Sequence, residues 1–226
     1  MTPFSRITLR TSDVEAARGF YESVLGPRVL DIVLLHEQAV ARGARPHWLG
    51  FLDVGDVDRA AAAFASRGAI ALGPKWVNPQ GLEAAVMRDP GGAIVALARS
   101  PVVAQDAKSA AGVVWYVLNT ADVERAKADY GELFGWHFKA PVDLGSLGVF
   151  HPFSWEPDGP PVGSMSDLRP GVHPHWLFHL RVAALDPALD AVKARGGVVV
   201  GPVTLPTGER LAICDDPQGA AFALLV

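Results

Sequence analysis

The stretch that decides the fold is PHWLFHLRV at residues 174–182, because a near copy, PHWLGFLDV, lies at residues 46–54. Each version begins with proline, alternates in the manner of a strand, and leads through a short turn into an alanine-rich helical segment. The offset from His47 to His175 is 128 residues. A strand and helix that recur in this way predict one structural module that is used twice.

Other segments recur in the same order. Asp13-Val14-Glu15 opens a predicted helix and matches Asp122-Val123-Glu124, and Ser12 and Glu15 are spaced as a capping box. The turn Asp89-Pro90-Gly91-Gly92 matches Asp216-Pro217-Gln218-Gly219, and we expect both aspartates to serve turn formation and not acid catalysis.

The offset between the copies is 109 residues at the first strand and helix and 128 at the Pro-His-Trp strand, so the second copy carries 19 extra residues. We therefore predict a truncated first module at residues 1–99 and a second module at 113–226 with an insert near 137–173. Residues 100–112 lack hydrophobic periodicity, which is typical of a linker. The insert contains Phe150, His151, Phe153 and Trp155.

Composition limits the class of protein. Half of the 226 residues are hydrophobic, the net charge is −4, and acidic and basic residues are interspersed without a basic stripe. A single cysteine, Cys214, excludes an internal disulfide and a cysteine zinc site. No apolar run approaches the roughly 20 residues of a membrane span, and the N-terminal residues are unlike a secretory signal. We expect a cytoplasmic protein with neither nucleic acid nor membrane as a partner.

These segments resemble the vicinal oxygen chelate superfamily, which includes glyoxalases, extradiol dioxygenases and bleomycin-resistance proteins. The residues that carry the resemblance are 13–26, 47–51 and 89–92 in the first copy and 122–135, 175–178 and 216–219 in the second. The Pro-His-Trp version is most similar to the branch labelled glyoxalase/bleomycin resistance protein/dioxygenase. The resemblance implies an α+β fold of paired βαβββ modules, whose sheets form a cup with the helices outside.

The resemblance also implies positions for the ligands of a divalent metal. They fall on Arg6, Leu49 and Ala96 in the first copy and on Trp115, Leu177 and Ala223 in the second. A guanidinium stays protonated, an indole only donates, and leucine and alanine carry no ligand atom. We therefore expect no metal or other cofactor at this site, which leaves the usual Lewis-acid chemistry without its ion.

A non-standard metal site is the alternative. Strand alternation places His175 and His179 on one face, and His151 of the insert is expected to come near them. Three imidazoles would suit zinc or iron. The other interpretation is that His47 and His175 recur because both strands need them structurally.

Alternation also predicts which side chains face the helices and which face the cup. The helix side is expected to receive Ile7, Leu9, Trp48, Leu52, Trp176, Phe178 and Leu180. The cup side is expected to receive Arg6, Thr8, Arg10, His47, Leu49 and Phe51 from the first copy and Trp115, Val117, Asn119, His175, Leu177 and His179 from the second. A mostly apolar lining with a few polar groups is typical of a small-molecule pocket.

Three cup residues suggest chemistry, and each also has a structural interpretation. Trp115 could stack on a planar ligand or only fill the interface between the modules. Arg6 or Arg10 could pair with a carboxylate or phenolate, or lie at a sheet edge. His179 could shuttle protons near neutral pH, or be a core residue whose hydrogen bonds are satisfied.

Three functions follow from this pattern. The first is binding of a small apolar or aromatic molecule in the cup without the usual metal. The second is an enzyme, namely a lyase, isomerase or oxygenase that uses His179, His175 or Arg6. The third is a non-catalytic scaffold whose cup is filled by residues 150–155 of the insert. A monomer and a homodimer both suit the pattern.

Overall fold

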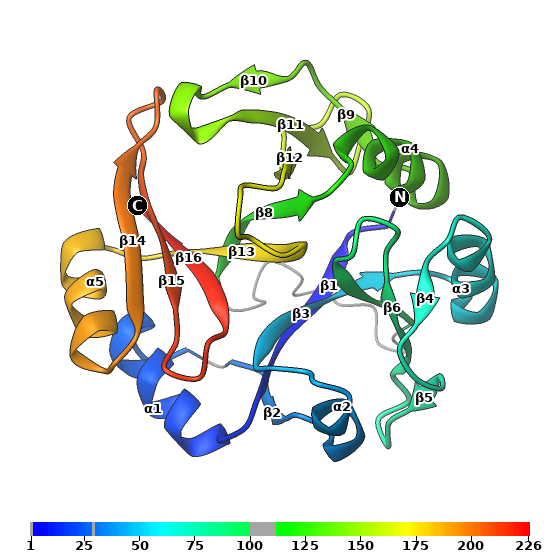
Figure 1. Cartoon of the computed structure of the whole chain (residues 1–226), viewed down its shortest axis with the longest axis horizontal. Coiled ribbons are helices and arrows are strands. Elements are labelled where there is room, and N and C mark those ends of the chain that lie inside the picture. The colour runs from blue at the N-terminus through cyan, green and yellow to red at the C-terminus, as the bar shows by residue number, and fades with distance from the viewer. Residues whose placement is uncertain (1, 29, 100–111) are drawn as a thin grey trace. The chain divides into compact units, whose positions relative to one another are not determined.

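The computed structural model of the chain describes residues 2–28, 30–99 and 112–226, and Figure 1 labels its helices and strands. The linker predicted at residues 100–112 lies outside the described residues, except for Gly112. Helices are few and are separated by runs of consecutive strands that form mixed sheets, which confirms the α+β class.

The first copy contains three helices and seven strands within the described residues. The helices are α1 (Val14–Leu25), α2 (Glu37–Ala41) and α3 (Val57–Ser66). The strands are β1 (Phe4–Thr11), β2 (Ile32–Leu34), β3 (His47–Asp53), β4 (Ile70–Ala71), β5 (Trp76–Val77), β6 (Glu83–Arg88) and β7 (Ile94–Arg99).

The second copy repeats this order and adds strands. Its helices are α4 (Val123–Phe134) and α5 (Leu185–Ala194), with a 3-10 helix at Gly145–Leu147. Its strands are β8 (Val113–Thr120), β9 (His137–Phe138), β10 (Val142–Asp143), β11 (Val149–Ser154), β12 (Gly163–Asp167), β13 (His175–Arg181), β14 (Val198–Thr204), β15 (Arg210–Asp215) and β16 (Ala221–Leu225).

Each copy contains two strand–helix units, namely β1–α1 and β3–α3 in the first and β8–α4 and β13–α5 in the second. In three of them an aspartate forms the N-cap by accepting a hydrogen bond from the backbone N–H three residues later: Asp13, Asp56 and Asp122. The N-cap of α1 is thus Asp13 and not the predicted Ser12. Ser12 is engaged elsewhere, because both its N–H and its hydroxyl donate to Oε1 of Gln218.

The strands form two mixed sheets. The first has the order β2-β1-β3-β7-β6-β4, with β5 paired to β6, and the second has the order β10-β11-β12-β8-β13-β16-β15-β14, with β9 paired to β11. In both copies the first strand has a short parallel neighbour, β2 beside β1 and β12 beside β8. The insert of the second copy forms β11 and the adjoining strands of the sheet.

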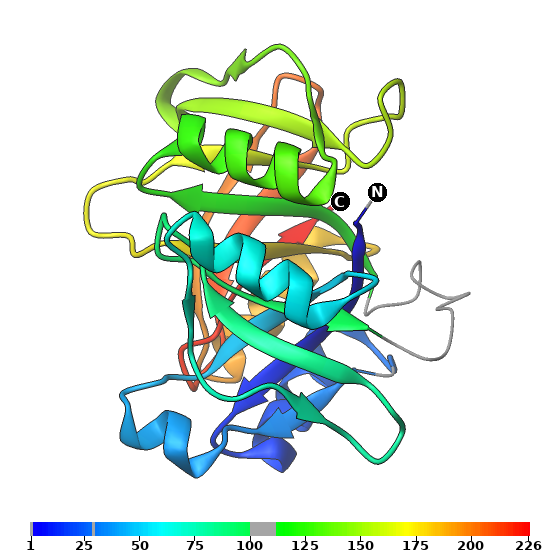
Figure 2. The same ribbon diagram turned by 90° about the vertical axis from the view of Figure 1, so that its right-hand side faces the viewer.

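The chain divides into two compact units, and each unit combines residues of both sequence copies. Unit 1 comprises the described residues within Met1–Arg6, Gly50–Ala107 and Trp115–Trp176. Unit 2 comprises those within Ile7–Leu49, Lys108–Val114 and Leu177–Val226. In unit 1 helix α3 of the first copy contacts α4 of the second, and Figure 2 shows them side by side. In unit 2 the contacting helices are α1 and α5.

The core of unit 1 is aromatic. Trp136 stacks on Phe153 of β11 with ring centroids 4.4 Å apart, and it also contacts Tyr130 of α4. Trp155 packs edge-on against the same Trp136. Phe153 and Trp155 of the insert therefore extend the core that contacts α4. Every residue predicted for the helix side is buried: Ile7, Leu9, Trp48, Leu52, Trp176, Phe178 and Leu180.

A buried hydrogen-bonded chain connects the two copies inside unit 2. The indole N–H of Trp48 donates to the hydroxyl of Tyr21 at 3.1 Å, and this hydroxyl donates to Oδ2 of Asp216 at 3.2 Å. The other carboxylate oxygen of Asp216 accepts the backbone N–H groups of Gln218 and Ala220. The turn aspartate of the second copy thus holds helix α1 and strand β3 of the first.

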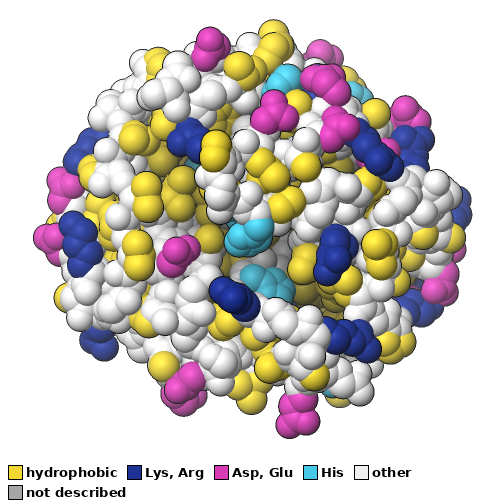
Figure 3. Space-filling view, viewed as in Figure 1, with side chains coloured by type: hydrophobic (Ala, Val, Ile, Leu, Met, Phe, Trp, Pro, Cys, Tyr) yellow, Lys and Arg dark blue, Asp and Glu magenta, His cyan; other side chains and the backbone are white. Residues whose placement is uncertain are grey.

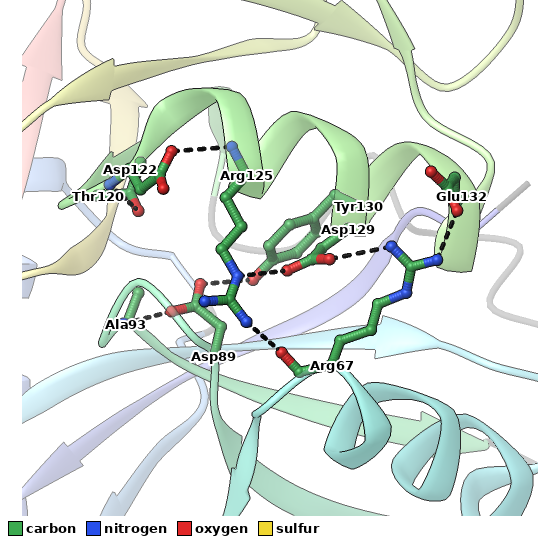
Figure 4. Close-up of polar contacts among 9 residues, drawn as sticks. All are labelled: Arg67, Asp89, Ala93, Thr120, Asp122, Arg125, Asp129, Tyr130 and Glu132. Carbon is green, nitrogen blue, oxygen red and sulfur yellow. Dashed lines mark hydrogen bonds and ion pairs between the residues drawn. The ribbon is translucent and has the colours of Figure 1, made fainter.

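Unit 1 contains the same hydrogen bond between a helix tyrosine and a turn aspartate, with the copies exchanged (Figure 4). The hydroxyl of Tyr130 on α4 donates to Oδ2 of Asp89 at 3.1 Å, and Oδ1 of Asp89 accepts the N–H of Ala93 at 2.8 Å. Trp176 packs edge-on against the Tyr130 ring. The two aspartates predicted to serve turn formation therefore also join the copies.

Burial changes the acidity of both partners in these pairs. Desolvation raises the pKa of Asp89 to about 6, although the hydrogen bonds from Ala93 and Tyr130 oppose this change. It raises the pKa of Asp216 in the same direction. It also raises the pKa of Tyr21 and Tyr130 well above the usual value, so both tyrosines remain hydrogen-bond donors.

Charged residues link α3 to α4 at the edge of this core (Figure 4). The Arg67 guanidinium, just after α3, donates to Asp129 at 3.1 Å and to Glu132, both on α4. Arg125 of α4 donates in turn to the backbone carbonyl of Arg67. Because the Asp129 side chain is only 6% exposed, its pairing with Arg67 is screened less than a surface ion pair.

We predict that Tyr130→Phe lowers the free energy of unfolding by about 1–3 kcal/mol, because the Asp89 carboxylate loses a donor while it stays buried. Tyr21→Phe should have a similar effect through Asp216. Urea denaturation measures both. A double-mutant cycle with Asp89→Ala tests the pair, and a coupling free energy of zero would show that the hydrogen bond contributes nothing.

We predict that Asp89→Asn changes the pH dependence of stability. Asp89 has a higher pKa in the folded chain, about 6, than its usual value near 3.8, so the folded state binds more protons between these values. Wild-type stability from this group is therefore present at pH 4 and is lost as the pH rises through 6. Relative to wild type, Asp89→Asn should gain on the order of 1–3 kcal/mol between pH 4 and 7.

The measurement is chemical denaturation at several pH values in this range. A difference between variant and wild type that is the same at pH 4 and pH 7 would refute the prediction, because a group that does not change its pKa on folding makes no contribution to the pH dependence.

Candidate functional site

The residues predicted to line a cup lie on strand faces opposite to the helix-packed ones, and they divide between the two units. Unit 1 contains Arg6, Phe51, Trp115, Val117, Asn119 and His175. Unit 2 contains Thr8, Arg10, His47, Leu49, Leu177 and His179. Each group has its own local geometry.

Trp115 and Asn119 of β8 share a face with two serines of β12 in unit 1. The parallel register pairs Val117 with Ser164 and Asn119 with Ser166, so the side chains on these positions lie on the same face. The Trp115 indole N–H donates to the Ser164 hydroxyl at 3.3 Å. The indole is therefore held in one orientation on a half-buried surface.

A directed chain of hydrogen bonds runs beside Trp115. The Ser166 hydroxyl donates to Oδ1 of Asn119 at 3.2 Å, and Nδ2 of Asn119 lies 3.4 Å from Nε2 of His175. Nδ1 of His175 is 2.8 Å from the backbone oxygen of His173. Because a carbonyl oxygen only accepts, Nδ1 carries the proton and Nε2 is the acceptor. The chain thus fixes the tautomer of His175.

Ser164 and Ser166 were not singled out from the sequence. Both are buried on β12, in the insert, and each contacts a predicted cup residue. Within GSMSD at residues 163–167, the two serines stand on either side of a methionine, and this spacing is the one local pattern that places both serines on one face of a strand. It does not show which strand pairs with β12, and this pairing gives the serines their partners.

His47 repeats the His175 geometry in unit 2. Its Nδ1 donates to the backbone oxygen of Arg45 at 2.7 Å, so its Nε2 also carries the lone pair. Burial lowers the pKa of His47, and the positive charge of Arg10 lowers it further. Arg10 occupies the place in the first copy that Asn119 occupies in the second. The copies thus put a cation and an amide, respectively, at one equivalent position.

Other predicted cup residues serve packing. The Thr8 hydroxyl is buried and donates to the Asp31 carboxylate. Leu49, Phe51 and Leu177 are all buried. Arg6 is half-buried. Because the Thr8 hydroxyl donates its one hydrogen to Asp31, it could only accept a hydrogen bond from a ligand.

His179 has a different environment from the other histidines. Its side chain is buried, and Nε2 has no hydrogen-bond partner among the residues that the structure describes. Desolvation lowers the pKa of His179 to about 4, so the ring is neutral at pH 7. This value does not suit the proton shuttle near neutral pH that the sequence suggested. The lack of a partner does not suit a satisfied core histidine either.

His151 does not join the other histidines, contrary to the expectation. The register pairs it with Met165, on the face opposite to Ser164 and Ser166. Its Nδ1 lies 3.8 Å from the Glu124 carboxylate of α4, so its ring is on the helix side. Across residues 2–28, 30–99 and 112–226, no group of three or more His, Cys, Asp or Glu side chains is arranged to hold a metal ion.

The side chains at the expected metal-ligand positions do not fit a divalent cation. Leu49, Ala96, Leu177 and Ala223 are buried and offer no donor atom. The indole of Trp115 donates to Ser164. The guanidinium of Arg6 adds a positive charge where a cation would need a lone pair.

On the face drawn in Figure 3, basic and acidic side chains are interspersed among apolar ones, and neither kind of charge gathers into a large patch. None of the helices in the described part of the chain is long and apolar enough to cross a membrane.

Comparison with solved structures shows the fold. The 2,3-dioxygenase LapB from Pseudomonas sp. KL28 aligns with a TM-score of 0.61 and 12% identity, over 97% of this chain and 90% of LapB. The Mn(II)-bound glyoxalase from Novosphingobium aromaticivorans aligns with a TM-score of 0.61 and 13% identity, over 100% of this chain and 83% of that one.

Comparison with protein sequences gives relatives and a family. The putative glyoxylase CFP32 of Mycobacterium bovis is 27% identical over 97% of this chain and 92% of its own length. The anthracycline biosynthesis protein DauV of Streptomyces sp. is 34% identical over 62% of this chain and 51% of its own length. A family model matches residues 112–224. Together with the twofold repeat and the mixed sheets, this match shows that the chain belongs to the Glyoxalase/Bleomycin resistance protein/Dioxygenase superfamily.

Proposed function

We propose that this protein binds a small apolar or aromatic molecule on the helix-free face of its sheets, without the metal that its family usually employs. The observation that carries the proposal is the set of non-ligand side chains at the expected metal positions, Arg6, Leu49 and Ala96 in one copy and Trp115, Leu177 and Ala223 in the other.

The local geometry of unit 1 supports this function. Trp115 offers an aromatic surface whose orientation is fixed by Ser164, and Asn119 is fixed by Ser166 and His175. A planar ligand on such a surface gains from stacking, while the neighbouring amide supplies directional hydrogen bonds. An apolar wall with a few oriented polar groups is the usual composition of a small-molecule site.

The relatives support an aromatic ligand as the first choice. DauV and DnrV, both from Streptomyces, are named as anthracycline biosynthesis proteins and share 34% and 32% identity with 62% of this chain. An anthracycline is therefore a suitable probe, because its fused rings test stacking and its hydroxyl and carbonyl groups test hydrogen bonding.

We predict that Trp115→Leu weakens anthracycline binding about fivefold or more, because an aromatic pair contributes roughly 0.5–1.5 kcal/mol beyond its buried area. Trp115→Phe keeps an aromatic face and should lose less. Trp155→Phe is the matched control, because Trp155 belongs to the aromatic core and should leave binding unchanged. Isothermal titration gives the dissociation constants, and no binding at millimolar ligand would refute the proposal.

We predict that protein purified without added metal contains no stoichiometric Mn, Fe, Ni or Zn, and that a chelator leaves ligand binding unchanged. The expected ligand positions lack lone-pair donors, which any of these ions needs. Elemental analysis provides the measurement. One bound transition ion per chain would contradict the assignment of these positions.

The alternative is an enzyme, a lyase, isomerase or oxygenase that uses His175, His179 or Arg6. The observation in its favour is the fixed tautomer of His175, whose Nε2 lone pair could accept a proton from a substrate. The relative named as a putative glyoxylase also favours it. If both His175→Ala and His179→Ala keep turnover, neither histidine is catalytic, and Arg6 is the remaining candidate of this alternative.

A further inference from the structure

The internal repeat provides a built-in comparison for His179. His179 on β13 is directly paired with Ala223 on β16. The equivalent pair in the first copy is Phe51 on β3 with Ala96 on β7. Both alanines are fully buried, and Phe51 is 1% exposed. The fold therefore accepts a hydrocarbon ring at this position, and it does not require an imidazole.

We expect an imidazole at this position to destabilise the fold relative to phenylalanine. His179 is 7% exposed and its Nε2 has no partner among the described residues, so a polar atom is removed from water without a replacement hydrogen bond. The first copy has phenylalanine at the equivalent position, Phe51. A histidine that is less favourable for folding than this phenylalanine calls for a functional reason.

The surroundings of His179 form an apolar strip that runs from the core to the surface. Across the strands of unit 2, His179 is followed by Ala223 on β16, Ile213 on β15 and Val200 on β14. Ile213 is 39% exposed and Val200 is 64% exposed. We name these four residues the His179 strip.

The strip lies on the helix-free face of these strands. Phe222, which directly precedes Ala223 on β16, packs against Phe20 and Tyr21 of α1. Because side chains alternate along a strand, Ala223 points away from that helix. The strip thus combines an apolar wall with a single unsatisfied polar atom at its buried end. This is the pattern of a small-molecule site, in which one polar contact fixes orientation.

We propose that the His179 strip of unit 2 binds a small apolar molecule that carries one hydroxyl group, and that this hydroxyl forms a hydrogen bond with Nε2 of His179. The inference rests on the proposed small-molecule function and adds a second site to that of Trp115, which belongs to unit 1.

The chemistry of the strip favours a neutral hydroxyl over other groups. A hydroxyl both donates and accepts, so it can satisfy Nε2 in either tautomer of a neutral imidazole. The low pKa of His179 supports a neutral ring in this environment. The four strip residues carry no charge, and the charged residues that flank them on the same face are one cation, Arg181 of β13, and one anion, Asp215 of β15, so the surroundings do not select an ionic ligand.

The test compares phenol with toluene, which has nearly the same shape and no hydroxyl, on wild type and on His179→Phe. Wild type should bind phenol at least about fivefold more tightly than toluene in isothermal titration, and His179→Phe should lose this preference. Because Phe51 shows that the ring fits, His179→Phe should fold normally and raise Tm by about 2–4 °C. The mirror variant Phe51→His should lower Tm without creating a phenol preference.

Several results would overturn the inference. They are equal binding of phenol and toluene by wild type, retention of the preference in His179→Phe, and a lower Tm for His179→Phe. Another such result is self-association that depends on protein concentration, is abolished by Val200→Asp and occurs without a preference for phenol. It would show that the strip contacts a second copy of the chain and not a small molecule. Loss of the Trp115 effect on anthracycline binding, with the phenol preference intact, would refute only the site in unit 1.

Discussion

A buried hydrogen bond between a helix tyrosine and a turn aspartate, present twice, is the interaction on which the rest of this structure depends. In each case the tyrosine and the aspartate come from different copies of the repeat, Tyr21 with Asp216 and Tyr130 with Asp89. Backbone N–H groups of each turn donate to one oxygen of the buried carboxyl group, and the tyrosine hydroxyl donates to the other, so this hydrogen bond favours docking of the helix of one copy on the turn of the other. Each of the two hydrogen bonds lies inside one compact unit, and each unit combines both copies.

The two copies share the residues that pair helix with turn and differ at several positions on their helix-free faces. Both copies have the tryptophan, the helix tyrosine and the turn aspartate. Both also have a histidine at the start of β3 or β13, and its Nδ1 donates to a backbone carbonyl two residues earlier. On the helix-free faces, by contrast, Arg10 corresponds to Asn119 and Phe51 corresponds to His179. A position that differs between copies of one fold is not fixed by folding alone, which makes these positions the best guide to function.

The proposed recognition of a small molecule rests on the arrangement of the polar groups. The side chains at the expected ligand positions lack donor atoms, whereas Ser166, Asn119 and His175 form a chain in which each hydrogen bond orients the next. Oriented amides and a neutral imidazole can discriminate between ligands through hydrogen bonds, and the apolar residues around them supply most of the contact area. The proposed sites differ accordingly, with an aromatic surface in unit 1 and an aliphatic strip in unit 2.

The sequence by itself determined the twofold repeat, the α+β class and the buried side of the strands, because strand alternation and turn motifs act between residues close in the chain, and the recurring segments carried the resemblance to the family. It also determined which metal-ligand positions lack donors. Only the tertiary structure decided that Ser164 and Ser166 contact Trp115 and Asn119, that His151 lies on the helix side, and that His179 has an unpartnered nitrogen. These features depend on which distant strands pair and in what register, and no local pattern specifies that pairing.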